Sequence, residues 1–267
     1  MPVFGHCVSG HANGYHFYSA VTIQGTARKA ARKSFDFVAR RFDSRERIHF
    51  LHIGKNAGTQ LEHVAGQVNR ASDRVRIVPH GHRVGLLDLP PGERYFFSVR
   101  SPETRFRSAF YSRKRKGRPR IHAEWSVYER EAFSEFEHAN DLAEALFEGG
   151  ERGHLALCAI KAISHCAMEQ INWFEKAGFF FTLNPPVYIV RQERFEEDLA
   201  VLLSRLGFDG RVSLARDAVS AHRNDYSAVP PLSVKAKKNL FAWYRQDVEF
   251  YRQCEYWIAR EQEGPAA

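Results

Sequence analysis

One segment near the start of the chain restricts its possible folds more than any other: residues 50–60, which read Phe-Leu-His-Ile-Gly-Lys-Asn-Ala-Gly-Thr-Gln. An apolar run is followed by a loop of small residues with one lysine, and then by the start of a helical pattern. Such a loop leaves backbone N–H groups unpaired at the positive end of a helix dipole. Gly54, Ala57 and Gly58 let an anion approach the backbone closely, and Lys55 adds a movable positive charge. The segment therefore predicts a strand, a phosphate- or sulfate-binding loop and a helix.

This loop differs from the loop that binds nucleoside triphosphates. That motif places its lysine after the second glycine and follows it with a serine or threonine that binds magnesium. Here Lys55 precedes Ala57-Gly58-Thr59, at the strand end of the loop. This position suits a lysine that reaches the bridging oxygen of a single nucleotide phosphate, without a metal ion.

Apolar runs and helical patterns alternate along the rest of the chain. Strands are predicted at residues 48–53, 75–78, 95–99 and 187–190. Helices are predicted at residues 59–68, 102–116, 133–147, 155–173, 195–206 and 233–258. Such alternation predicts an α/β fold, a parallel sheet flanked by helices with ligands at the carboxyl ends of the strands.

A second phosphate-binding segment is predicted at residues 95–112. Its first residues form an aromatic strand, and Pro102 follows a serine at the start of a helix. Arg100 therefore stands where the strand ends, while Arg105 and Ser108 share one face of the helix. An arginine at a strand end, together with a serine on the following helix, can hold a terminal phosphate.

Together the two segments resemble the cofactor-binding motifs of sulfotransferases that use 3′-phosphoadenosine 5′-phosphosulfate (PAPS). In the carbohydrate branch of that family the loop reads Ile-Pro-Lys-Thr-Gly-Gly-Thr-Ser, where residues 53–60 here read Ile-Gly-Lys-Asn-Ala-Gly-Thr-Gln. The second motif reads Val-Arg-Asp-Pro, then Arg-Phe and Ser-Ala-Tyr. This chain keeps its two arginines, proline and serine, with Ser101 in place of Asp and Phe110 in place of Tyr.

The resemblance implies a P-loop-like central parallel sheet with helices on its faces, the fold of PAPS-dependent sulfotransferases. It also implies PAPS as the sulfuryl donor, no metal, and a 3′-phosphate held by Arg100 and Ser108. Arg223 lies in a late basic loop and is a further candidate, although this segment also suits a capped turn. The residues predicted to bind the cofactor are Lys55, Asn56, Ala57, Gly58, Thr59, Gln60, Arg100, Ser108 and Arg223.

A pair of histidines lies between the two motifs, in His80-Gly81-His82. In uronyl 2-O-sulfotransferases a His-Gly-His after the second strand carries the catalytic base, so the resemblance makes His82 the base and His80 its helper. Imidazole titrates close to neutral pH and can take the proton of an attacking hydroxyl. Lys55 would complete the catalytic set. In the alternative interpretation one histidine caps a loop and the other is solvated. If His82 is not the base, His80 or Glu62 is the next candidate.

A run of basic residues follows the second motif at residues 113–120. It is either a solvated loop at a helix C-terminus or the wall of a groove in which Arg113, Lys114 and Arg115 bind an acidic sugar chain. Nucleic acid is not an expected partner, because no aromatic residues for base stacking are interleaved with the charges. The net charge of +8 agrees with an anionic partner.

We expect an N-terminal extension over residues 1–46, with a basic amphipathic stretch at 27–42, and a single sulfotransferase domain over residues 47–262. No apolar run approaches the roughly 20 residues of a membrane span, and the first residues lack the features of a signal peptide. The sequence thus predicts a cytoplasmic enzyme. Four cysteines show no disulfide or metal spacing.

The predicted activity is transfer of a sulfuryl group from PAPS to an acceptor hydroxyl, with a carbohydrate favoured, and release of adenosine 3′,5′-bisphosphate (PAP). Three alternatives stay open: a P-loop kinase, a non-catalytic protein that binds glycans or polyanions, and a sulfotransferase for a lipid, protein or small-metabolite acceptor.

Overall fold

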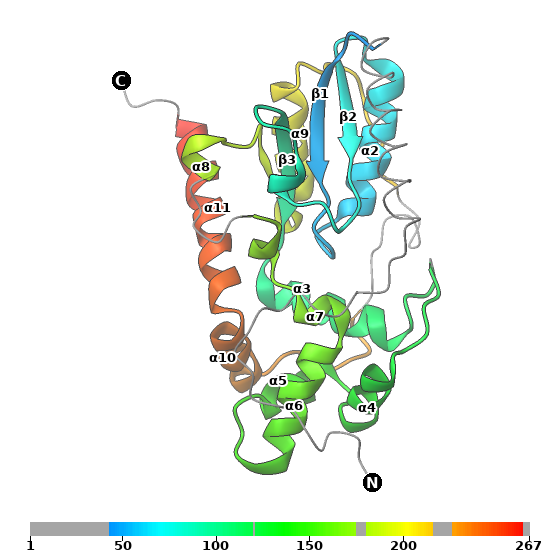
Figure 1. The fold of residues 1–267 in the computed structure, drawn as a ribbon, viewed down its shortest axis with the longest axis vertical. Coiled ribbons are helices and arrows are strands. Elements are labelled where there is room, and N and C mark those ends of the chain that lie inside the picture. The colour runs from blue at the N-terminus through cyan, green and yellow to red at the C-terminus, as the bar shows by residue number, and fades with distance from the viewer. Residues whose placement is uncertain (1–42, 120, 175–179, 216–225, 264–267) are drawn as a thin grey trace. The chain divides into compact units, whose positions relative to one another are not determined.

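The computed structural model describes residues 43–119, 121–174, 180–215 and 226–263 (Figure 1). Two of the predicted features, the amphipathic stretch at 27–42 and Arg223, lie outside the described residues. The chain divides into two compact units, Met1–Glu46 and Arg47–Ala267. The predicted extension over residues 1–46 stays a prediction, since most of it lies outside the described residues.

Four parallel strands form the sheet of the larger unit, in the order β2-β1-β3-β4. The strands are β1 (Glu46–Leu51), β2 (Val75–Pro79), β3 (Arg94–Val99) and β4 (Ile189–Arg191). Phe50 of β1 lies opposite Phe96 of β3, and Phe97 lies opposite Ile189 of β4. All four side chains are buried, as expected for a parallel sheet with both faces covered.

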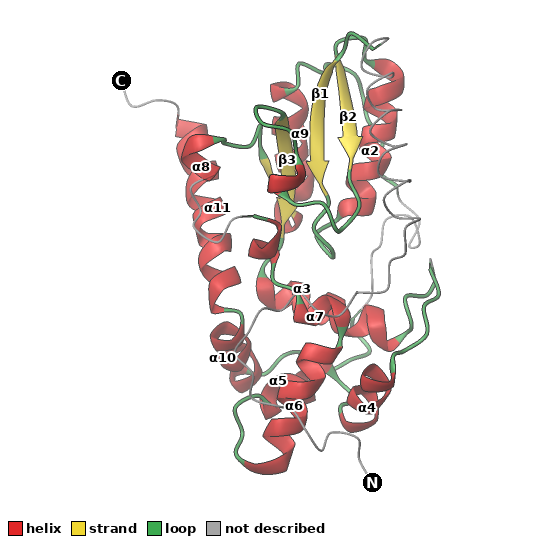
Figure 2. Cartoon of the chain, viewed as in Figure 1, coloured by secondary structure: helices red, strands yellow, loops and turns green. Residues whose placement is uncertain are grey.

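Helices flank this sheet, as Figure 2 shows. The side chains of α2 (Gly58–Ala71), α9 (Phe195–Arg205) and α11 (Arg245–Glu263) join the strands in one hydrophobic core. Apolar residues recur at helical spacing on these helices, and each buries that face against the strands. The predicted α/β class, with a parallel sheet and flanking helices, is confirmed.

A second hydrophobic core is built from helices alone, beyond the carboxyl ends of the strands in Figure 1. Its helices are α3 (Pro102–Lys114), α4 (Val127–Glu135), α5 (Ala139–Ala145), α6 (Gly150–Ala162) and α10 (Val234–Trp243). Short helical segments complete the described chain: η1 (Leu86–Asp88), α7 (Ser164–Ala167), η2 (Gln170–Trp173), α8 (Phe180–Leu183) and η3 (Gln192–Arg194). Ligands of parallel sheets bind at the carboxyl ends of the strands, so this helical layer faces the candidate site.

Three of the predicted helices are wrong in extent. The segment 133–147 is broken between α4 and α5, and 155–173 comprises α6, α7 and η2. The predicted helix 233–258 is interrupted at Tyr244, which separates α10 from α11. The Tyr244 side chain is buried and its hydroxyl donates a hydrogen bond of 2.6 Å to the Cys166 carbonyl. Helix periodicity alone does not reveal a break that a tertiary contact stabilises.

Candidate functional site

The site begins with the loop between β1 and α2. Lys55 and Ala57 both have positive φ, 73° and 59°, an uncommon conformation for residues other than glycine. Left-handed residues in such a turn aim successive N–H groups into one concavity that suits an anion. Within the described part of the chain, the backbone N–H groups of Lys55, Asn56, Ala57 and Gly58 have no hydrogen-bond partner. The loop therefore has the backbone geometry of an anion-binding site.

Gly58 allows the loop to pack tightly against β1. A Cβ atom at this position would lie 1.8 Å from His52 Nε2, so no larger residue fits without displacing the imidazole. The other nitrogen of that ring, Nδ1, lies 3.0 Å from Glu62 Oε1. The predicted fallback base Glu62 thus holds His52 in place beneath the first turn of α2.

Asn56 anchors the loop to the neighbouring strand. Its side chain is fully buried, and Nδ2 donates to the Ser98 carbonyl at 2.9 Å and to Gln170 Oε1 at 2.7 Å. The Ser98 hydroxyl returns a bond of 2.6 Å to the Asn56 carbonyl. The Asn56 side chain therefore points into the protein, and only its backbone N–H is available to a ligand.

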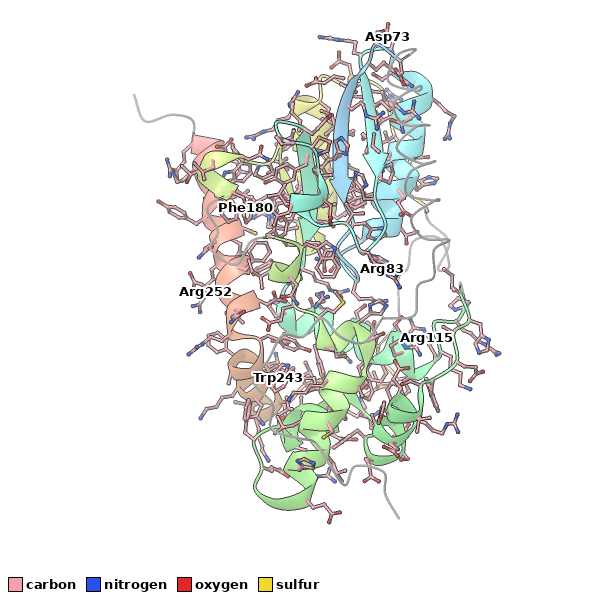
Figure 3. The ribbon with its side chains drawn as sticks, in the orientation of Figure 1. Asp73, Arg83, Arg115, Phe180, Trp243 and Arg252 are labelled. Carbon is pink, nitrogen blue, oxygen red and sulfur yellow. The ribbon has the colours of Figure 1, made fainter. Side chains whose placement is uncertain are left out.

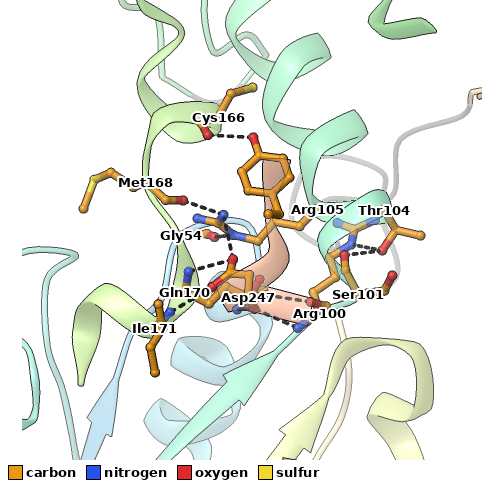
Figure 4. A network of polar contacts seen from close by, with 12 residues as sticks. Gly54, Arg100, Ser101, Thr104, Arg105, Cys166, Met168, Gln170, Ile171 and Asp247 are labelled. Carbon is orange, nitrogen blue, oxygen red and sulfur yellow. Dashed lines mark hydrogen bonds and ion pairs between the residues drawn. The ribbon is translucent and has the colours of Figure 1, made fainter. Parts of the chain in front are cut away.

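Arg105 fixes the other side of the loop, as Figure 4 shows. This buried side chain donates from Nε to the Gly54 carbonyl at 3.1 Å and from Nη1 to the Met168 carbonyl at 2.7 Å. Its nearest carboxylate is Asp247, at 4.0 Å. Among the described residues, no hydrogen-bond partner is found for Arg105 Nη2, which is also buried.

The predicted 3′-phosphate arginine meets the predicted 5′-phosphate loop. Arg100 donates from Nη1 to the Lys55 carbonyl at 3.3 Å and from Nε to the Thr104 hydroxyl at 3.0 Å. Burial lowers the pKa of the Arg100 guanidinium. Ser108, the other predicted contact of the 3′-phosphate, is buried on α3 one turn after Arg105.

Lys55 is surrounded by positive charge. Burial, followed by the charges of Arg115, Arg100 and Arg105, lowers its pKa from 10.5 to about 8. No ion pair joins Lys55 to a carboxylate of the described residues. We call Lys55, Arg100, Arg105 and Arg115 the cationic cluster. Four like charges at one loop are stabilised only when an anion is present, because opposite charge favours their protonated forms.

His82 lies at the edge of this loop with its ring exposed. Its Nδ1 is 2.9 Å from the His52 carbonyl, and a carbonyl only accepts, so Nδ1 carries the proton and Nε2 is the basic nitrogen. A Cβ atom at Gly54 would lie 3.9 Å from His82 Nδ1. The ring is therefore adjacent to the β1–α2 loop, with Nε2 as the nitrogen that can accept a proton.

His80 lies in a different chain of contacts. Its Nε2 is 2.7 Å from His49 Nδ1, and His49 Nε2 is 3.2 Å from a carboxylate oxygen of Glu93. The two rings stack with centroids 5.0 Å apart. The helper role of His80 stays a prediction, and these contacts direct its ring toward His49.

The residues of the basic segment differ in their contacts. Arg113 is buried in a bidentate ion pair with Glu129, with contacts of 2.6 and 2.7 Å. Lys114 Nζ lies 2.7 Å from a Glu137 carboxylate oxygen. Arg115 is the member whose charge acts on Lys55, and Figure 3 shows it at the end of α3, on the same side as Arg83. Of the three residues predicted to bind the acceptor, Arg115 is the one whose charge lowers the pKa of Lys55, and its Nε donates to the Arg118 carbonyl at 2.8 Å.

Thr59 and Gln60 occupy the first turn of α2, as predicted. Thr59 is half-buried, whereas Gln60 is buried. The Gln60 Oε1 atom has no hydrogen-bond partner in the described ranges of the chain. Both residues lie next to the loop, so both stay candidate cofactor contacts.

Two residues of the site were not predicted from the sequence. His165 on α7 has Nδ1 3.4 Å from the Cβ position of Gly54, and its ring centroid lies 6.3 Å from that of His82. Burial, followed by the charges of Lys55 and Arg105, lowers the pKa of His165 to about 3. Gln170 on η2 accepts hydrogen bonds from Asn56 Nδ2 and from the Arg100 N–H. Neither residue belongs to a motif that a single sequence reveals.

No protein-family model, curated protein or solved structure matches this chain. In the described residues, no group of three or more histidine, cysteine, aspartate or glutamate side chains could hold a metal ion. None of the helices in the described ranges combines the length and the apolar character that a membrane crossing requires.

Proposed function

We propose that this protein is a PAPS-dependent sulfotransferase, with the sulfotransferase version of the parallel α/β fold and a hydroxyl acceptor, favoured to be a carbohydrate. The observation that carries the proposal is the cationic cluster around a loop with unpaired N–H groups and a lysine without an acidic partner in the described residues. The arrangement would be unfavourable in a purely structural loop, because like charges and unpaired donors both destabilise a folded chain.

The described residues fit a nucleotide that carries two separate phosphates. The loop N–H groups and Lys55 would bind the 5′-phosphate at the start of α2. Arg100, one hydrogen bond away at the Lys55 carbonyl, would bind the 3′-phosphate together with Ser108. The unpartnered Nη2 of buried Arg105 is a further donor that a bound anion would satisfy.

The chain's own residues would divide the chemistry among them. When PAPS is bound, its sulfur–oxygen bond to the 5′-phosphate breaks as the acceptor oxygen binds sulfur, and the electron pair leaves with PAP. Lys55 and the loop N–H groups would stabilise the charge that grows on the leaving phosphate, and removal of one such donor costs about 3–4 kcal/mol. His82 Nε2 would accept the acceptor proton, since Nδ1–H is held by the His52 carbonyl.

An anionic acceptor is supported by Arg115. The charge of this half-buried residue acts on Lys55, and its Nε donates to the Arg118 carbonyl at 2.8 Å, whereas Arg113 is buried in its ion pair with Glu129. A carbohydrate with carboxylate or sulfate groups would meet this charge.

The proposal is tested by transfer from radiolabelled PAPS to a panel of acceptors: acidic glycans, neutral glycans, phenols and hydroxysteroids. Label should appear in a glycan product with wild-type protein, and the rate should fall by about 10²–10⁴-fold with His82→Gln, while both proteins still bind PAP. Binding of PAP without transfer to any acceptor would contradict the enzymatic part of the proposal and leave an anion-binding protein.

A further inference from the structure

Gln170 connects the two predicted phosphate sites through a single buried amide. The residue opens η2 and is fully buried. Its Oε1 accepts hydrogen bonds from Asn56 Nδ2 at 2.7 Å and from the Arg100 backbone N–H at 3.0 Å. Its Nε2 donates to the Arg100 carbonyl at 2.8 Å. One side chain therefore holds the anchor of the phosphate loop and both backbone groups of the arginine at the end of β3.

The backbone of Gln170 is itself held in place by Asp247 of α11. The Asp247 carboxylate accepts the N–H groups of Gln170 at 2.8 Å and Ile171 at 3.0 Å. The same carboxylate lies 4.0 Å from Arg105 Nη1, and Arg105 bonds the Gly54 carbonyl. The network in Figure 4 thus joins η2, α11, α3 and the phosphate loop.

We infer that Gln170 is a positioning residue that sets the spacing between the 5′-phosphate loop and the 3′-phosphate arginine, so that a nucleotide carrying both phosphates binds more tightly than its separate parts predict. The inference rests on the proposed function. A buried amide with three short bonds allows neither Asn56 nor Arg100 to move alone, since any movement would leave a buried polar group unsatisfied. Preorganised spacing of this kind strengthens binding of a ligand that spans both sites.

Gln170→Glu is the informative substitution. It keeps the size of the side chain and an acceptor for Asn56 and the Arg100 N–H, but it removes the donor to the Arg100 carbonyl. The matched control is Gln67→Glu on α2, where the amide bonds Ser213 at the surface. Asn56→Ala is a second variant that removes the other end of the bridge and leaves the bonds from Gln170 to Arg100 intact.

The measurement is calorimetric titration of each protein with PAP, adenosine 5′-phosphate and adenosine 3′-phosphate. The carboxylate of Gln170→Glu repels each phosphate, so we expect the Kd for PAP to rise about tenfold or more beyond the product of the increases for the two monophosphates. Asn56→Ala also loses the bond from the loop to the Ser98 carbonyl, so adenosine 5′-phosphate should weaken too, but the loss for PAP should again exceed the product of the two monophosphate losses. Gln67→Glu should match wild type. Such a pattern identifies lost coupling between the sites, because a general structural defect weakens all three ligands alike.

Equal weakening of the three nucleotides in both bridge variants would overturn the inference, as would an unchanged affinity for PAP. If Gln170→Glu fails to fold, the Asn56→Ala result decides alone. Failure of the wild-type protein to bind PAP would instead overturn the proposed function, and with it this inference. Binding of PAP by wild type with unaltered coupling in the variants would overturn the inference only.

Discussion

Replacement of Lys55 by methionine should stabilise the free protein while it weakens nucleotide binding. The pKa of Lys55 lies at about 8 rather than 10.5, a fall of about 2.5 that is due first to burial and then to three arginines. Each whole pKa unit corresponds to about 1.4 kcal/mol, so the charged form is disfavoured on folding by at most about 3.4 kcal/mol. The side chain is partly exposed, and solvent screening reduces this figure to about 1–2 kcal/mol.

The pH dependence follows from the sign of this pKa change. Above pH 10.5 the amine is neutral in both the folded and the unfolded chain, and it does not affect stability. As the pH falls from 10.5 to about 8, the unfolded chain binds a proton that the folded chain does not, and the wild type loses stability. Below about pH 8 the full penalty is present. The difference between Lys55→Met and wild type should therefore be largest at neutral pH and should vanish by about pH 10.5.

The assay is thermal unfolding of the free protein at a series of pH values. At pH 7 we expect the Tm of Lys55→Met to exceed that of wild type by about 2–8 °C. Lys238→Met is the matched control, because Lys238 is exposed on α10 and its replacement should change stability by no more than about 0.5 kcal/mol. A Tm for Lys55→Met equal to or below that of wild type at pH 7 would refute the reasoning that Lys55 is held, unfavourably charged, for a ligand.

Other expectations concern the remaining parts of the site. His82→Gln should leave the Kd for PAP unchanged and lower the transfer rate by about 10²–10⁴-fold, and full activity in radiolabel transfer would move the base elsewhere. His165 should stay neutral until the pH falls to about 3, because burial and nearby cations lower its pKa; its free-chain pKa is higher, so it destabilises the folded protein as pH falls from about 6.5 toward 3. A nuclear magnetic resonance titration in which the His165 ring protonates near pH 6 would contradict this. Gly58→Ala should abolish PAP binding, since its Cβ would lie 1.8 Å from His52 Nε2, and the double variant Gly58→Ala/His52→Ala should recover part of it; undiminished binding by Gly58→Ala alone would show that the loop is not held as described.

Local patterns in the sequence were sufficient for the strand–loop–helix segment. The apolar run before Gly54 and the small residues after it predicted β1, the loop and α2, although β1 ends at Leu51 rather than Ile53. Arg100 was correctly expected at the end of β3. The starts of such strands and helices depend on residues that are neighbours in the sequence, so they can be predicted from one sequence alone.

The features that could not be predicted from the sequence depend on contacts between residues far apart in the chain. Arg113 pairs with Glu129, a residue of the next helix, and no spacing rule singles out that partner. His165 and Gln170 lie on short helical segments far along the chain from the loop that they contact. The break at Tyr244 likewise depends on a hydrogen bond to Cys166.

The most direct test of the account is calorimetric titration of the purified protein with PAP, with ATP plus magnesium as the comparison. The account predicts binding of PAP with a Kd in the micromolar range or below, and little heat with ATP, because the proposed sites at the loop and at Arg100 would hold two separate phosphates and Lys55 precedes Gly58. Preference for ATP with magnesium, or binding of neither nucleotide, would contradict the central claim that this site holds PAPS.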